Sequence, residues 1–375
     1  MDRPQANSKK QFKELLVILL ATAPSVAEEP APKLSLHAVA TPIKANRLLA
    51  MSMDEDGCIW TGSFDRAVHR YDPHTGKTET IALPEQGTAS ACLCAGKKVY
   101  ILGQTYPKLT IYDPASKKFT AAAYPSAKPN VWYGIVAGAG KHLYLFDRGA
   151  SGIIKWDTQT ETGQAIAWPY YKAPFPGSGI DVPADKAIWC RSTDSTSGPY
   201  NQVGIARLDL AKDEFTGWFD FPKDDRELKP FTDPATTLFF PSTLKGKLAP
   251  FDFKDKRWCK FLDVPQYGQL FGFIGSQTAH KGRYYFSLST FNGTDTSCDG
   301  KPYHFCNAIL EFDPQTRKFD FLTLEVKDAY HQIAYMLSAG GEFFATGSNI
   351  REPDGKLNRS QRGETVFWQT TVPAK

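Results

Sequence analysis

The chain has 375 residues, of which 42% are hydrophobic and 13% aromatic, enough for a substantial core. Its formal net charge of +4 is too small to indicate a nucleic-acid-binding protein, so any charged ligand must be held by a local cluster of side chains. A content of 29 Gly and 26 Pro suits an all-β protein with many turns.

The N-terminal segment has the pattern of a secretory signal. Three lysines precede a short apolar run at residues 15–23, and the small residues Ser25, Val26 and Ala27 follow. We therefore expect residues 1–27 to be a signal peptide and residues 28–33 a linker. The protein would be exported, to the periplasm or beyond, with no membrane span after removal of the signal. The alternative is an amphipathic N-terminal helix, which Glu14 favours.

The stretch from Arg47 to Pro84 is the first complete copy of a repeated unit. It has four short segments of β-branched and aromatic residues separated by Gly, Asp and Pro, which predicts a four-stranded antiparallel meander, one blade of a propeller. Its third segment ends in Tyr71-Asp72-Pro73, and the Asp is expected to accept hydrogen bonds from backbone amides of the turn. Related corners follow at Tyr112-Asp113-Pro114, Trp156-Asp157-Thr158, Leu208-Asp209-Leu210, Phe251-Asp252-Phe253 and Phe312-Asp313-Pro314.

Proline marks the end of each predicted fourth strand. These prolines are Pro84, Pro125, Pro169, Pro222 and Pro265, and their successive separations are 41, 44, 53 and 43 residues. That period is typical of propeller blades rather than of helical repeats. It favours one domain over residues 34–375 instead of several smaller ones.

The two ends of the chain are predicted to share a blade. Residues 34–41 alternate like a strand and stop at Pro42, but no other strands precede them, whereas the C-terminal strands lack an outermost partner. Pairing residues 34–41 with residues 364–371 would close the ring. We therefore predict an all-β, seven-bladed β-propeller with four-stranded blades. The blades are expected at residues 43–84, 85–125, 126–169, 170–222, 223–265 and 266–324, with the last at 325–373 plus the N-terminal strand.

Polar and aromatic residues are concentrated on one predicted face. Insertions at residues 191–202, 289–307 and 348–363 lie there, and long loops on one side of a regular scaffold indicate a binding site. Arg pairs with carboxylates and aromatic rings stack on sugars, so these residues suit an anionic carbohydrate; the alternative is that they only decorate the rim. The substrate-binding candidates are Arg66, Arg191, Arg351, Trp132, Tyr133, Tyr171 and His304.

One histidine is predicted to lie nearest the central channel. His331 follows Tyr330 at the entry to the innermost strand of the last blade. A histidine beside a tyrosine at a channel mouth suits general acid-base chemistry, and a hydrogen-bonded structural histidine is the alternative. Our catalytic candidates are His331 as the base and Tyr330 or Tyr200 as the acid.

The seven cysteines predict one disulfide. Cys298 and Cys306 share a single loop and are the best candidate pair in an exported protein. Cys58 and Cys190 stand beside tryptophans and are expected to be small core residues. The pairing of the remaining cysteines stays open.

No recognised catalytic or phosphate-binding motif is present, and no metal site is defined. Asp295 and Asp299 could help to hold a calcium ion, although acidic loop residues are more often simply solvated. The cofactor is therefore unknown, with a divalent cation such as Mg²⁺ or Ca²⁺ as an option.

The run Asp56-Gly57-Cys58-Ile59-Trp60-Thr61-Gly62, followed by Tyr71-Asp72-Pro73 and Thr75-Gly76-Lys77, resembles the repeat of virginiamycin B lyase-like propellers. The resemblance covers most of the chain as architecture. It implies a seven-bladed protein that opens its substrate by elimination, with a histidine base and a magnesium ion. The catalytic positions of that family cannot be aligned with residues of this sequence. Several polysaccharide lyases are similar propellers, with His, Tyr and Arg around the channel mouth.

These observations predict an exported carbon-oxygen lyase that acts by β-elimination on an anionic, uronate-containing polysaccharide or oligosaccharide. Its expected partner is that carbohydrate, with no nucleic acid, and the protein is expected to be a monomer. The alternatives are a non-enzymatic carbohydrate- or protein-binding propeller and a virginiamycin B lyase-like or lactonase-like enzyme. The substrate, the metal dependence and catalysis itself are not determined by the sequence.

Overall fold

The computed structural model divides the chain into two compact units, Met1–Leu34 and Ser35–Lys375. All described residues belong to the second unit. They are residues 36–46, 48–63, 65–84, 88–103, 108–123, 133–137, 140–147, 152–170, 178–194, 201–241, 246–265, 273–289, 305–323, 331–349 and 362–370. No helix in this part of the chain is long and apolar enough to cross a membrane.

The described strands form antiparallel sheets, five of them meanders of four consecutive strands. The first contains β2 (Leu48–Met53), β3 (Ile59–Ser63), β4 (Ala67–Asp72) and β5 (Lys77–Ala82). The second contains β6 (Ala89–Ala95), β7 (Lys98–Gly103), β8 (Lys108–Asp113) and β9 (Lys118–Ala123). The third contains β10 (Tyr133–Ala137), β11 (His142–Asp147), β12 (Gly152–Asp157) and β13 (Thr162–Ala167).

The fourth sheet contains β14 (Ser178–Val182), β15 (Ala187–Asp194), β16 (Asn201–Asp209) and β17 (Glu214–Asp220), with a 3₁₀ turn, η2 (Pro183–Asp185), between its first two strands. The sixth contains β22 (Phe273–His280), β23 (Arg283–Ser289), β24 (Phe305–Asp313) and β25 (Lys318–Thr323). In the first sheet, β3 is buried along its whole length whereas β5 is mostly exposed, as expected for a second and an outermost strand.

A composite sheet joins the two ends of the described chain. Its order is β1 (Leu36–Asn46), β28 (Arg362–Thr370), β27 (Glu342–Asn349) and β26 (His331–Ala339). The register pairs Leu36 with Thr370 and Asn46 with Arg362, with an irregularity between Val39 and Ile43. The predicted pairing of the N-terminal strand with the C-terminal one is therefore present.

The fifth sheet departs from the predicted four-stranded blade. It contains β18 (Thr237–Pro241), β19 (Lys247–Asp252), β20 (Arg257–Trp258) and β21 (Leu262–Asp263), but β20 and β21 both pair with β19. The sheet is thus three strands wide, so the described residues form six regular four-stranded blades and not the seven predicted. Residues 223–236, the beginning of the blade expected at 223–265, form no strand and contain the 3₁₀ turn η3 (Pro234–Thr236). This segment is dense in charge and contains Pro230 and Pro234, which cannot donate to a β-ladder.

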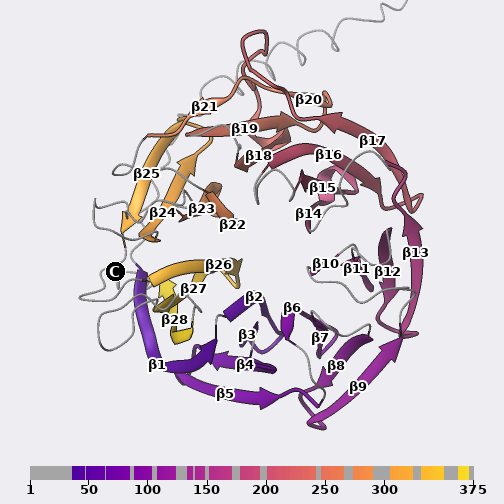
Figure 1. Cartoon of the computed structure of the whole chain (residues 1–375), viewed down its shortest axis with the longest axis vertical. Helices are drawn as coiled ribbons and strands as arrows, with labels where there is room; N and C mark the ends of the chain where they lie inside the picture. Colours follow the sequence, from indigo (N-terminus) through magenta and orange to yellow (C-terminus); the bar gives the residue numbers. More distant parts are fainter. Residues whose placement is uncertain are drawn as a thin grey trace, which may run out of the picture. The chain divides into compact units, whose positions relative to one another are not determined.

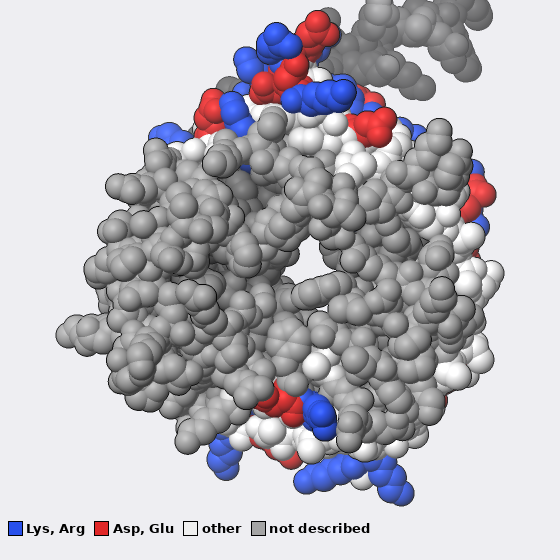
Figure 2. Space-filling view, in the orientation of Figure 1, with Lys and Arg blue, Asp and Glu red and all other residues white. Residues whose placement is uncertain are grey.

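The segment preceding β18 packs along the outer strands of this sheet instead. The backbone N–H of Lys260 donates to the carbonyl of Lys229 at 2.8 Å, and that of Phe261 donates to the carboxylate of Asp225 at 3.1 Å. Farther along, Phe231 is buried, and its carbonyl accepts a hydrogen bond from Arg317 of the sixth sheet. Charged side chains of both signs gather at the periphery beside β20 and β21 (Figure 2).

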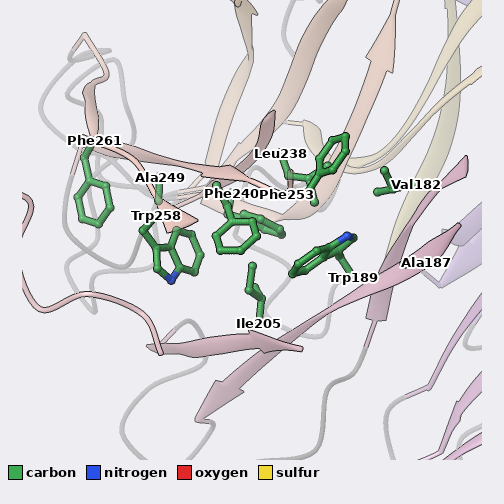
Figure 3. Close-up of a cluster of buried hydrophobic side chains, with 11 residues drawn as sticks. Val182, Ala187, Trp189, Ile205, Leu238, Phe240, Ala249, Phe253, Trp258 and Phe261 are labelled. Atoms are coloured by element: carbon green, nitrogen blue, oxygen red, sulfur yellow. The ribbon is translucent and has the colours of Figure 1, made fainter. Parts of the chain in front are cut away.

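Hydrophobic clusters join each sheet to the next. One cluster brings Trp189 and Ile205 of the fourth sheet against Phe240 and Trp258 of the fifth (Figure 3). Similar clusters link the first four sheets in chain order, and another links the fifth with the sixth. The sixth sheet contacts the composite sheet through the rings of Tyr285 and Phe343, whose centroids are 4.9 Å apart. A further hydrophobic cluster packs the composite sheet on the first sheet. The sheets therefore follow one another around a β-propeller ring (Figure 1).

The predicted aspartate corners are confirmed throughout this ring. The carboxylate of Asp72 accepts a hydrogen bond from the backbone N–H of His74 at 2.9 Å. Equivalent bonds, from the backbone N–H two residues later, are made by Asp113, Asp157, Asp209, Asp252 and Asp313. Each Asp thus fixes the turn that leads to the outermost strand of its sheet.

Candidate functional site

The regular sheets present two different faces of the ring. We call the face with the hairpin turns between first and second and between third and fourth strands the turn face. The opposite face, the loop face, holds the starts of the innermost strands and the connections between second and third strands. Most of those connections lie outside the described residues.

The structure places four of the predicted site residues on the loop face by their backbone positions. His331 is the first residue of β26 and pairs with Asn349, and Tyr133 is the first residue of β10 and pairs with Asp147. Arg191 pairs with Ser178, the first residue of β14. Arg66 is exposed in the turn between β3 and β4, with a φ of +62°. Because β2 and β26 are neighbouring innermost strands, Arg66 and His331 belong to adjacent sheets.

The other predicted site residues cannot be placed. Tyr330, Tyr200, Arg351, Trp132, Tyr171 and His304 lie outside the described residues. Cys298 does so too, and Cys306 is known only as a backbone position in β24, so the predicted disulfide stays a prediction. Cys58 and Cys190 are buried free thiols, as expected for core residues.

Two described histidines have structural roles. His69 is buried, with Nδ1 3.0 Å from the hydroxyl of Thr80 and Nε2 3.0 Å from the hydroxyl of Ser63. Burial lowers the pKa of His69 to about 4, so its ring is neutral at physiological pH. His280 is buried against Ser338, with Nδ1 2.8 Å from the hydroxyl, and burial lowers its pKa as well. Neither ring is at the loop-face end of an innermost strand, where His331 begins β26.

The structure also shows a cavity that the sequence did not predict. It has a volume of about 650 Å³ and lies on the turn face between the first and second sheets. Its walls come from the turn between β2 and β3, from β4 and β5, and from the turns of the second sheet. Residues from both sheets and of both charges line it: Asp54, Asp56, Trp60, Arg70, Glu79, Lys97, Tyr112 and Lys117.

Asp54 organises one wall of this cavity. One carboxylate oxygen accepts hydrogen bonds from the backbone N–H of Asp56 at 3.0 Å and of Cys58 at 2.8 Å. The other accepts a hydrogen bond from the indole N–H of Trp60 at 2.7 Å. Arg70 lies over the Trp60 ring, 5.9 Å from its centroid, and donates from Nη2 to the sulfur of Cys58 at 2.8 Å. A sequence signal exists in hindsight, since an acidic turn residue precedes the second-strand tryptophan here and at Asp185 and Trp189.

A divalent cation was one option for the cofactor. Within the described ranges, no group of three or more His, Cys, Asp and Glu side chains is arranged to hold a metal ion. Asp295 and Asp299 lie outside those ranges. The divalent cation therefore stays an untested prediction.

The chain is similar to solved lyase structures in its fold. No family model and no curated protein matches it. The structure aligns with selenomethionine-substituted virginiamycin B lyase from Staphylococcus aureus at 13% identity and a TM-score of 0.61, covering 91% of this chain and 99% of that one. A catalytically inactive histidine-to-alanine variant of the same lyase, with quinupristin, aligns at 13% identity and a TM-score of 0.64, covering 91% and 100%.

A streptogramin B lyase structure aligns at 14% identity with a TM-score of 0.60, covering 89% of this chain and 97% of the other. The chain therefore has the β-propeller arrangement of virginiamycin B lyase, as its repeat resemblance implied. At these identities the likeness concerns the fold and not the residues of a site.

Proposed function

We propose that this chain is a carbon-oxygen lyase whose site lies on the loop face of the propeller. The observation that carries the proposal is the position of His331, the first residue of the innermost strand β26 on that face. Arg66 and Arg191 are on the same face. The fold likeness to virginiamycin B lyase, in which a histidine-to-alanine variant is catalytically inactive, supports a histidine-dependent reaction.

The proposed reaction is β-elimination next to a carboxylate. His331 takes the proton from the carbon that bears the carboxylate, and the electrons of that C–H bond form a carbon-carbon double bond. The C–O bond at the next carbon breaks, and the departing oxygen receives a proton from Tyr330 or Tyr200. Arg191 and Arg351, with Arg66, neutralise the carboxylate so that the neighbouring proton becomes acidic.

We propose that the chain is exported and that its substrate is a uronate-containing glycan. Arginines on the loop face suit the carboxylate, and the predicted aromatic residues suit the sugar rings. The signal-like segment at residues 1–27 supports export. A second candidate is a cyclic streptogramin B antibiotic, which the fold likeness to streptogramin B lyase favours.

A substrate panel tests the reaction class. The purified chain is incubated with a series of uronate polysaccharides, with matched neutral polysaccharides and with a streptogramin B antibiotic. Elimination from a uronate leaves a conjugated double bond that absorbs ultraviolet light, so a rise in absorbance with the uronates alone supports our proposal. If only the antibiotic is cleaved, the proposed lyase activity is supported but the proposed uronate substrate is wrong. Binding to glycans without any product would identify a carbohydrate-binding propeller instead.

A further inference from the structure

Two sheets contain the same arrangement of aspartate, tryptophan and arginine. In the first sheet Trp60 pairs across the strands with Arg70, and in the fourth sheet Trp189 pairs with Arg207. Each tryptophan donates its indole N–H to an aspartate of the preceding turn, Asp54 at 2.7 Å or Asp185 at 2.9 Å. The two copies provide an internal comparison of what the arginine does.

In the fourth sheet the arginine is fully engaged by the protein. Its Nε donates to a carboxylate oxygen of Asp185 at 2.8 Å, and Nη2 donates to the carbonyl of Asp185 at 2.9 Å. Its Nη1 donates to Asp209 and to the hydroxyl of Thr216, both at 2.9 Å. Arg207 is therefore a structural residue with no donor group to spare for a ligand.

Arg70 lacks these partners. Its Nε is 3.9 Å from the carboxylate of Asp54, a long ion pair that is beyond hydrogen-bond distance. Asp72, in the position of Asp209, accepts from the hydroxyl of Thr75 at 2.8 Å instead. Among the described residues, the hydrogen-bond acceptor of Arg70 is the sulfur of Cys58. Burial raises the pKa of the Cys58 thiol to about 11, so this acceptor is uncharged and leaves the guanidinium without a hydrogen-bonded counter-charge.

The cavity in front of Arg70 has walls of opposite charge. The first sheet contributes the exposed carboxylates of Glu55, Asp56 and Glu79, and Arg70 lies in the same sheet, cross-strand from Glu79. The second sheet contributes the exposed lysines Lys97 and Lys117. Lys98 is on the same side, but it pairs with Glu161 at 2.5 Å. A pure anion would meet the acidic wall and a pure cation would meet Arg70 and the lysines, so a ligand with both charges fits best.

We propose that this cavity binds a zwitterionic short peptide or amino acid. The ligand's carboxylate pairs with the guanidinium of Arg70 and faces Lys97 and Lys117 of the second sheet, and its ammonium group lies against the carboxylates of the first sheet. The site is on the turn face, opposite the proposed catalytic residues, so it stands independently of the lyase proposal.

Calorimetric titration of the full chain with three matched probes tests this site. The probes are trialanine, N-acetyl-trialanine, which keeps only the carboxylate, and trialanine amide, which keeps only the ammonium group. We expect trialanine to bind at least about tenfold more tightly than either blocked form. If N-acetyl-trialanine binds as tightly as trialanine, the cavity is a simple anion site and our proposal is wrong. If trialanine does not bind, the proposal is overturned.

Variants then locate the binding. Arg70→Gln should weaken trialanine binding at least about tenfold, whereas Lys212→Gln, a change at an exposed turn of the fourth sheet, should leave it unchanged. Melting of each variant is compared with the parent chain. Should Arg70→Gln melt early, Glu79→Gln gives a second readout, because this exposed change should weaken trialanine and not N-acetyl-trialanine. Unchanged affinity in both variants would contradict the assignment.

Discussion

The guanidinium of Arg207 holds the carboxylate of Asp185 through two nitrogens, with Nε at 2.8 Å from Oδ2 and Nη2 at 3.2 Å from Oδ1. Their side chains are 12% and 19% exposed. Asp185 also raises the pKa of Arg207, chiefly through this hydrogen bonding. The pair fixes the turn after β14 to the third strand of its sheet.

Replacing Arg207 by Met should therefore destabilise the fold by about 3 kcal/mol, because it leaves Asp185 partly buried without its counter-charge. Denaturant unfolding measures the loss. Arg226→Met is the matched control, since Arg226 makes an ion pair of the same 2.8 Å length with Asp224 but is 84% exposed. The control should unfold like the parent chain. Equal losses in the two variants would contradict the role of burial.

Acid should weaken the fold through His69. Its pKa is lowered to about 4 in the folded protein from 6.5 in the unfolded chain, so only the unfolded chain binds the proton between these values. Stability that is present at pH 7 is then lost as the pH falls through this window, by roughly 2 kcal/mol at pH 5. Asp65 opposes the shift only in part.

The measurement compares unfolding of the parent chain and His69→Gln at pH 7 and pH 5. The variant should lose less stability over this interval, because a glutamine does not titrate. The turn aspartates are shared by both proteins, and the pKa of Asp157, for example, is lowered to about 2. Identical pH dependence in the two chains would show that His69 does not carry the effect.

The close approach of the first two sheets depends on Gly62. A Cβ atom at this position would lie 2.2 Å from the carbonyl oxygen of Ala89, on the innermost strand of the next sheet. Gly62→Ala should cost about 3 kcal/mol, because backbone rather than a flexible side chain must move. Gly282→Ala controls for conformational strain alone, since it has a φ of +75° and no atom within 4 Å, and should cost about 1 kcal/mol. If thermal unfolding shows similar losses of stability in the two variants, the clash at Gly62 does not account for the effect.

The N-terminal strand should be needed for stability. Deleting residues 34–42 removes much of β1 and leaves the edge of β28 without its partner. The midpoint of thermal unfolding should fall sharply. A chain that starts at residue 34 retains all of β1 and serves as the control. If both truncated chains melt together, the pairing of β1 with β28 contributes little.

The sequence predicted the fold well where each sheet repeats the same local chemistry. Asp72 and its equivalents mark real corners, because a carboxylate that accepts turn amides acts within a few residues. The prediction of a complete four-stranded fifth blade was wrong. The period alone could not show that the charged segment around Asp225 runs along the outer strands. The cavity at Arg70 was missed because it depends on which partners lie across two sheets. The backbone of His331 lies where predicted, at the start of an innermost strand.

The central claim, elimination by a histidine on the loop face, is tested most directly by one rate comparison. The initial rise in ultraviolet absorbance is measured with the best uronate substrate for the parent chain, His331→Ala and, as a control on the turn face, His142→Ala. We expect His331→Ala to lose at least about a hundredfold in rate with an unchanged melting midpoint, because a general base contributes on that order. His142→Ala should keep the parent rate. A folded His331→Ala variant that retains the full rate would contradict the account.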